Sequence, residues 1–405
     1  MENLEILGDC FLKLAMSLSL FHQYPTGDAG KLTTEKDWFV SNLNLYQLAM
    51  KKGLQNYLNA HKPIYSGNQA NWMPPGYKVD ANNAEKYMKG KVKRKAIADM
   101  IEALIGCYLV STDYITTLKF MQWLDLKVIP INDADQMEIP PVLRPGLIDT
   151  MPDVINQVNA FFINQEFDKI EKEINYIFKN KAYLIAAFTH ASYVNNRLTQ
   201  CYERLEYLGD AVLDFLVIRC LFIEHYKHVT PSRVTNLRQD LSNNGRLAYI
   251  LYSCQLHKKI LYLSPHLFSQ IELFHKAMTE RSEKQATEEQ DIYEWADSTA
   301  PKPLADVFEA LVGAIFIDCG YSLDTVWKVI EPLLRQYIDQ SIKKTNINPI
   351  RTVFEKGGKY LKQTTDGKGN FTYTIILLNG EEVTGHGKNT KLAKYDSCRR
   401  AIKLL

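Results

Sequence analysis

The chain has 405 residues, of which 46% are hydrophobic and 23% are charged, and its formal net charge is +2. This length and apolar content predict two or three domains with hydrophobic cores, and they argue against a disordered chain. The near balance of charge neither indicates nor excludes a nucleic-acid partner, so only local clusters of charge can do so.

The sequence also argues against a membrane protein and a secreted protein. No stretch reaches 18 consecutive apolar residues, so we expect no transmembrane helix and no membrane partner. The seven cysteines are scattered, form no CxxC pair and follow no secretory signal. This pattern is typical of an intracellular protein whose thiols are reduced. We therefore expect a cytoplasmic location, with the nucleus as the alternative.

The first predicted element is a helix at the start of the chain, where apolar residues recur at three- and four-residue spacing. It reads Glu2-Asn-Leu-Glu5-Ile-Leu-Gly8-Asp9. Because Glu5 and Asp9 are four residues apart, both side chains leave the same face of that helix. Glycine inside a helix costs about 1 kcal/mol relative to alanine, so Gly8 suggests a place where another helix packs closely.

A second acidic helix is predicted near residue 95, in Lys95-Ala-Ile-Ala-Asp99-Met-Ile-Glu102. Asp99 and Glu102 are three residues apart and also share a face. If this helix packs against the first one, four carboxylates converge. Beyond it, residues 131–153 contain four prolines, which predicts a connector without a continuous helix.

Both acidic helices return in the second half of the chain. The first recurs as Glu203-Arg-Leu-Glu206-Tyr-Leu-Gly209-Asp210, and the second as Lys302-Pro-Leu-Ala-Asp306-Val-Phe-Glu309. The two aspartates are 90 residues apart in the first copy and 96 apart in the second. Agreement in both content and spacing predicts two homologous domains.

The last segment, from residue 349 to 405, has a different pattern. A short helix is followed by a strand at Phe371-Thr-Tyr-Thr-Ile-Ile, a hairpin signal at Asn379-Gly380, another strand, and a basic helix from about Lys391. We expect a small α-β-β-β-α module. Residues 347–405 contain 11 Lys and Arg against 5 Asp and Glu, a net charge of +6, so basic charge is concentrated here.

The chemistry of the acidic helices follows from their convergence. Four neighbouring carboxylates repel one another, and a hard divalent cation such as Mg²⁺ or Mn²⁺ removes that conflict. Up to two ions per site, roughly 3.5–4 Å apart, would activate a water and stabilise the leaving oxygen of a phosphodiester. Lys95 and Lys302 precede Asp99 and Asp306 by one helical turn, where each would contact the phosphate or balance the acids.

A simpler interpretation is that these are solvated helix faces. For a single Glu-x-x-x-Asp pair that interpretation is the better one, but recurrence of both pairs at matching spacing argues strongly against it. The two lysines are weaker candidates, since an ordinary surface lysine would look the same.

These residues also carry a resemblance. The segment Glu203–Asp210 resembles the signature of the ribonuclease III family, and Thr189-His190-Ala-Ser192-Tyr193 resembles the short motif that precedes it. Two tandem copies followed by a double-stranded-RNA-binding module resemble the Dicer branch of the family. Residues 71–77 and 175–183 look like animal-type features of that branch.

The resemblance implies a mainly α protein, in which two all-helical nuclease domains form an intramolecular pseudo-dimer beside a small α+β module. The expected divisions are a first nuclease domain at 1–130, incomplete at its N-terminus, a linker at 131–157, a second nuclease domain at 158–343 and the RNA-binding module at 347–405. It further implies an endoribonuclease of small-RNA (siRNA and miRNA) processing that cuts one strand of double-stranded RNA per domain, leaving 3′ overhangs. Double-stranded-RNA-binding proteins and Argonaute are the implied protein partners.

The resemblance also implies which residues form the site, because each family position can be matched to a position in this sequence. The expected metal ligands and catalytic carboxylates are Glu5, Asp9, Asp99, Glu102, Glu206, Asp210, Asp306 and Glu309. In the tail, Lys388, Lys391 and Lys394 would meet RNA phosphates across the major groove. Thr390 stands where the family often has a first lysine, which predicts weaker RNA binding.

Two alternatives stay open. The helicase, platform and PAZ regions of the Dicer branch are missing, so the chain is either a C-terminal fragment or a natural short form, and its nuclease activity would then be altered. The other alternative is a catalytically idle scaffold that only binds double-stranded RNA. The presence of all eight carboxylates favours an active enzyme.

Overall fold

A computed structural model describes residues 2–58, 93–139, 152–225, 230–285, 300–343, 349–365, 369–387 and 390–404. The animal-type feature expected at 71–77, three of the four connector prolines and Lys388 lie outside these ranges. Across the described ranges, no helix combines the length and apolar character that a membrane crossing requires.

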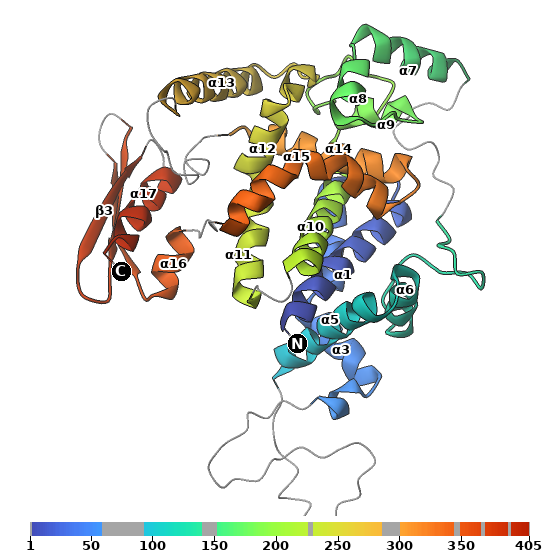
Figure 1. Cartoon of the computed structure of the whole chain (residues 1–405), viewed down its shortest axis with the longest axis horizontal. Helices are drawn as coiled ribbons and strands as arrows, with labels where there is room; N and C mark the ends of the chain where they lie inside the picture. The colour runs from blue at the N-terminus through green and yellow to red at the C-terminus, as the bar shows by residue number, and fades with distance from the viewer. Residues whose placement is uncertain are drawn as a thin grey trace, which may run out of the picture. The chain divides into compact units, whose positions relative to one another are not determined.

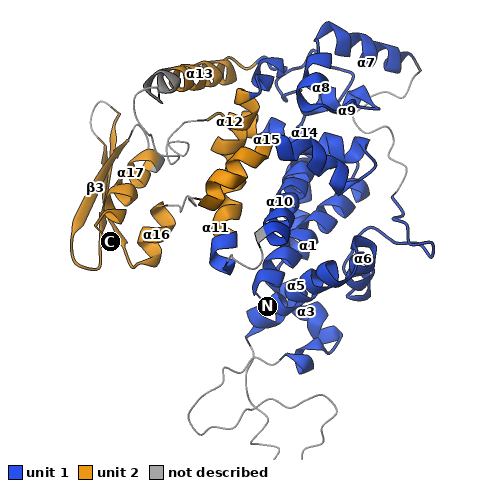
Figure 2. Ribbon diagram, in the orientation of Figure 1, with its two compact units in different colours: residues 1–234, 254–263, 306–332 blue, residues 235–253, 264–305, 333–405 orange. Residues whose placement is uncertain are grey.

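The chain forms two compact units, coloured separately in Figure 2. Unit 1 consists of residues 1–234, 254–263 and 306–332, and unit 2 of residues 235–253, 264–305 and 333–405. Three helices have residues in both units: α11 (Pro231–Leu241), α14 (Lys302–Asp318) and α15 (Leu323–Lys343).

Unit 1 is helical, as expected, and it contains all eight candidate carboxylates. Its remaining elements are α1 (Glu2–Gln23), α2 (Ala29–Phe39), α3 (Asn42–Lys51), η1 (Leu54–Tyr57), α5 (Arg94–Ser111), α6 (Tyr114–Trp123), α7 (Pro152–Asn164), α8 (Asp168–Ile174), α9 (Lys181–Ala187), α10 (Glu203–His225) and η3 (Leu256–Lys259). The four acidic segments therefore form α1, α5, α10 and α14, which confirms their predicted helical structure (Figure 1).

The two longest helices of unit 1, α1 and α10, pack against each other. They run antiparallel, because Arg204 in the first turn of α10 bonds to the carbonyl oxygen of Phe21 in the last turn of α1. Midway along the pair, the rings of Phe11 and Phe215 lie 5.4 Å apart. One copy of the repeat thus packs on the other through its first acidic helix, as in the expected pseudo-dimer.

A segment that precedes α10 covers the end of α14 in the second copy. Asp318, the last residue of α14, accepts hydrogen bonds from the Tyr176 hydroxyl at 2.8 Å and from the backbone N–H groups of Lys179 and Asn180. Ser111 holds the equivalent place in the first copy and is exposed. The two copies therefore share their central helices and differ in what surrounds them.

Unit 2 contains α12 (Asn244–Ser253), α13 (Pro265–Gln285) and the tail module. The module consists of α16 (Pro349–Glu355), β1 (Lys359–Thr365), β2 (Phe371–Ile376), β3 (Glu382–Gly387) and α17 (Thr390–Ile402). The strands form an antiparallel sheet in the order β1-β2-β3. This confirms the expected α-β-β-β-α arrangement.

The hairpin between β2 and β3 turns at Gly380, whose φ of 85° suits glycine. Helix α17 packs on β2 and β3 around a core that includes Val353, Ile375 and Ala393. At Gly385, a Cβ atom would lie 2.0 Å from the backbone nitrogen of Ser397. Only glycine allows β3 to approach the helix so closely.

Candidate active site

The first acidic cluster depends on a close crossing of α1 and α5. A Cβ atom on Gly8 would lie 1.8 Å from the carbonyl oxygen of Glu102, and one on Gly106 would lie 2.1 Å from that of Leu4. Neither distance is sterically possible, so the two helices touch backbone to backbone. This contact brings Glu5, one turn before Gly8, opposite the acidic residues of α5.

The same crossing recurs between α10 and α14. A Cβ atom on Gly209 would lie 1.8 Å from the carbonyl oxygen of Glu309, and one on Gly313 would lie 2.3 Å from that of Leu205. The expected close packing at Gly8 and Gly209 is confirmed. Sequence reasoning missed Gly106 and Gly313, although each stands four residues after the last glutamate of a repeated segment.

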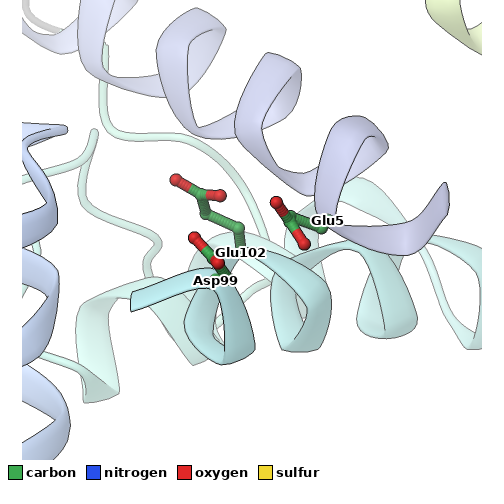
Figure 3. A group of neighbouring side chains, drawn as sticks. All are labelled: Glu5, Asp99 and Glu102. Atoms are coloured by element: carbon green, nitrogen blue, oxygen red, sulfur yellow. The ribbon is translucent and has the colours of Figure 1, made fainter. Parts of the chain in front are cut away.

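In the first cluster, Glu5 from α1 faces Asp99 and Glu102 from α5 (Figure 3). One carboxylate oxygen from each of the three lies within 4.8 Å of the others. Asp9 is one turn further along α1 and is not part of this close group. Its carboxylate forms an ion pair with Lys13, one turn further along α1, at 2.7 Å.

The second cluster has the same composition. Glu206 from α10 lies with Asp306 and Glu309 from α14, again with oxygens within 4.8 Å of one another. Asp306 and Glu309 are only 5% and 9% exposed, whereas Asp210 is exposed and lies outside the close group. In each copy, therefore, three of the four predicted carboxylates converge and the first aspartate stands beside them.

The electrostatics of the first cluster reveal the conflict between its acids. Burial, reinforced by the charges of Asp9, Asp99 and Glu5, raises the pKa of Glu102 to about 8. Burial and the charge of Asp99 also raise the pKa of Glu5. These shifts mean that the nearby positive charges do not offset burial and the repulsion between the acids. A hard divalent cation with oxygen ligands would fit both clusters.

The lysines that precede the second acidic pair behave differently. Lys95 donates to both oxygens of Asp99, at 2.7 and 2.8 Å, and this hydrogen bond raises the pKa of the lysine. It therefore balances an acid of the first cluster in this structure, and its contact with a phosphate stays a prediction. Lys302 is the exposed first residue of α14 and belongs to unit 2, so its role also stays a prediction.

Tyr202 supports the second cluster and was not anticipated. Its buried hydroxyl donates to Asp306 at 3.4 Å, and its ring lies 5.8 Å from that of His190. Nδ1 of His190 accepts from the backbone N–H of Ser192 at 3.0 Å. The motif at residues 189–193 thus braces the second cluster. The repeat gave no signal for Tyr202, because its equivalent position in the first copy is Met1.

The candidate RNA-binding lysines lie at or near the start of α17. Lys388 precedes the helix outside the described residues, and Lys391 lies in its first turn, with its side chain also outside them. The Lys394 ammonium lies 5.0 Å from the centroid of the Phe354 ring and 5.8 Å from that of Tyr373. Lys394 therefore packs within its own module, and its contact with RNA stays a prediction.

Family models match most of the chain. The model of the Ribonuclease III domain matches residues 2–113 and 203–320, and that of the Dicer double-stranded-RNA-binding domain matches residues 326–405. The first matches include both members of each acidic pair. The second begins within α15 and extends through the tail module.

Individual relatives agree with the family models. The chain is 31% identical to Endoribonuclease dcr-1 of Caenorhabditis elegans, covering all of this chain and 25% of that protein. It is 36% identical to Endoribonuclease Dicer of Danio rerio over 77% of this chain and 17% of that protein. The chain thus spans about a quarter or less of these relatives.

Among solved structures, similarity extends to the nuclease domain of ribonuclease III from Campylobacter jejuni. The identity is 29% over 42% of this chain and 95% of that one, with a TM-score of 0.29. Dicer from Giardia intestinalis is 14% identical over 83% of this chain and 54% of that one, with a TM-score of 0.42.

Proposed function

Because the chain belongs to the ribonuclease III family, we propose that it is an endonuclease that hydrolyses both strands of double-stranded RNA, with one carboxylate cluster serving each strand. The observation that carries this proposal is the duplicated cluster. Two sets of three carboxylates, each held by a pair of helices that touch at two glycines, occur in one compact unit. A scaffold that only binds RNA has no need of two such costly arrangements.

In this proposal the cofactor is Mg²⁺ or Mn²⁺, with up to two ions per site. Glu5, Asp99 and Glu102 would hold the cation in the first site, and Glu206, Asp306 and Glu309 in the second. When bound, the cation supplies an activated water and charge stabilisation at the leaving oxygen. Asp9 and Asp210, on the same helix faces, would complete the ligand sets through their carboxylates or through water.

The protein's own groups prepare the site for that cation. Glu102 holds a proton at neutral pH because its pKa is about 8, so it must release this proton before it can act as a ligand. Lys95 keeps Asp99 in place through its ion pair. In the second site, Tyr202 orients Asp306 through its hydroxyl. Both carboxylate sets are thus positioned by backbone contacts and side-chain hydrogen bonds.

The tail module would hold the RNA duplex. Its net charge of +6 favours phosphate binding, and A-form RNA is read mainly by shape, 2′-OH groups and phosphates, with little sequence preference. Lys388 and Lys391 are the stronger candidates, since Lys394 is engaged with two aromatic rings. We expect this binding to weaken as the salt concentration rises.

The wider role is also a proposal, since the chain spans only part of its curated relatives. In this role the protein would produce short RNA duplexes with 3′ overhangs for small-RNA pathways in the cytoplasm. Argonaute and double-stranded-RNA-binding proteins are the proposed partners. Support comes from the order of the matched domains, which is two nuclease domains followed by the Dicer type of RNA-binding domain.

Cleavage of labelled RNA tests the proposed activity. A blunt duplex with a different fluorophore on each strand is incubated with the protein in Mg²⁺, in Mn²⁺ and in EDTA. We expect both strands to be cut in either metal and neither in EDTA. A protein that retains the duplex in a gel-shift assay but cuts neither strand in either metal would be the idle scaffold.

A further inference from the structure

The two ends of the α1–α10 pair carry different side chains at equivalent positions of the repeat. At the end where α10 begins, the Arg204 guanidinium donates to the carbonyl oxygens of Phe21 and Tyr24, each at 2.9 Å, and to that of Gly27. Its charge also lies 4.7 Å from the centroid of the Phe21 ring. These carbonyls belong to the last turn of α1 and the segment after it, where backbone acceptors have no helical partner.

Arg204 is well suited to this place. A guanidinium is a planar group with five donors, and a positive charge at a helix C-terminus interacts favourably with the helix dipole. Tyr207, one turn further along α10, is buried in a cluster with Leu20 of α1 and Leu32 of α2. One turn of α10 is therefore inserted between two helices of the first copy.

The opposite end of the pair has a different side chain at the equivalent position. The repeat places Asn3 where Arg204 stands, and among the described residues no group donates a hydrogen bond to its buried Oδ1 atom. A cavity of about 750 Å³ opens at this end. Its lining includes Leu4 and Leu7 from the start of α1, and Phe222 and Ile223 from the end of α10.

We propose that Arg204 is the positioning residue that sets the spacing of the two carboxylate clusters, so that both strands of one duplex are cut in a single encounter. This inference rests on the proposed function. Glu206 is two residues from Arg204 on α10, and it belongs to the second cluster. By holding the start of α10 on the end of α1, Arg204 links the helix of the second cluster directly to that of the first.

The clamp adds to the contacts that Phe215 makes with Phe11 and Arg219 with Tyr114, and of these three it is the one closest to Glu206 along α10. Glu5 lies in the first turn of α1 and Glu206 in the first turn of α10, at opposite ends of the pair and roughly 20 Å apart along the helix axis at 1.5 Å per residue. Sliding or splaying of α1 against α10 changes that separation while leaving each glycine crossing intact. Loss of Arg204 should therefore weaken the coordination between the two cuts more than it slows either cut alone.

The experiment measures both cuts separately under single-turnover conditions. A duplex with a different fluorophore on each strand is cut by the wild type, Arg204→Ala and Arg204→Lys. For Arg204→Ala we expect the ratio of singly to doubly cut duplex to rise about tenfold, from the loss of charged hydrogen bonds. We also expect the positions of the two cuts to vary relative to each other. Arg204→Lys keeps the positive charge but loses the planar set of five donors. Its ratio of singly to doubly cut duplex should therefore lie between those of the wild type and Arg204→Ala.

Arg197→Ala is the matched control, because Arg197 is exposed in the loop before α10. A structural role alone would lower the folded fraction and slow both cuts equally, leaving the ratio at its wild-type value. An unchanged ratio in Arg204→Ala, or in Arg204→Lys if the alanine variant does not fold, would overturn the inference. Failure of the proposed function is distinguishable, since the wild type would then cut neither strand.

Discussion

The two copies of the repeat are alike at their centres and different at their edges. In both, two glycines bring a pair of helices into backbone contact, and three carboxylates converge beside that contact. Around the second copy, Asp318 anchors the segment that precedes α9, and Tyr202 bonds to Asp306. Around the first, Ser111 is exposed and Val110 is 55% exposed.

This difference separates what the proposed chemistry requires from what merely supports it. Convergence of the acids depends on the glycine crossing, which both copies retain. Protection of the crossing by neighbouring segments varies between the copies. If both clusters are active, the crossing is sufficient to build a site, and the supporting contacts tune its stability.

The strongest test inactivates one copy. Replacing Asp306 with alanine removes a buried carboxylate of the second cluster, and we expect cleavage of one strand to fall about a thousandfold while the other is cut normally. Adding Asp99→Ala should abolish both cuts. Separate fluorophores on the two strands report each cut, and Asp133→Ala, at an exposed position, is the control. Loss of both cuts in Asp306→Ala alone would show that the copies are not independent.

The next test breaks the feature that the copies share. In Gly209→Ala the new methyl group would lie 1.8 Å from the Glu309 carbonyl, so the helices must separate, and we expect a loss of about 3 kcal/mol in stability. Chemical denaturation measures this loss. Gly30→Ala is the matched control, because a Cβ atom there meets only Asp28 Oδ1, at 3.3 Å. Alanine in that helix should be neutral or stabilising. Equal effects of the two substitutions would contradict the close crossing.

The smallest effect concerns the clamped end of the α1–α10 pair. Burial, together with the charge of Arg204, lowers the pKa of His22 to about 4 from its ordinary 6.5. The folded protein therefore favours the neutral imidazole. The resulting stability is fully present above pH 6.5 and is lost as the pH falls towards 4, by an amount of order 2 kcal/mol.

His22→Phe tests this pH dependence without removing the aromatic ring, which packs 5.5 Å from Phe21 and 5.6 Å from Tyr321. We expect the difference in unfolding free energy between pH 7 and pH 5 to be smaller in the variant. Denaturant melts at both pH values measure it. At the opposite end of the pair the equivalent residue is Ile223, which does not titrate. An unchanged pH dependence would place the acid sensitivity elsewhere.

Local pattern was enough to predict the helices, the tail module and the convergence of three of the four carboxylates in each copy, because each depends on periodicity within a short segment or on repetition. The contacts that join distant segments were not predictable. Arg204 bonds to carbonyl oxygens some 180 positions earlier, and no spacing rule identifies such partners. Asp9 shows the limit of the same-face rule, since it shares a helix face with Glu5 yet lies outside the close group and pairs with Lys13.

The asymmetric clamp has a consequence for how such a protein can evolve. In a symmetric homodimer every substitution appears twice, once at each end of the interface. With both copies in one chain, an arginine at one end and an asparagine at the other can be selected separately. Because both copies are joined in one chain, the residues at one end of the interface can change while those at the other end, including Arg204, keep their contacts.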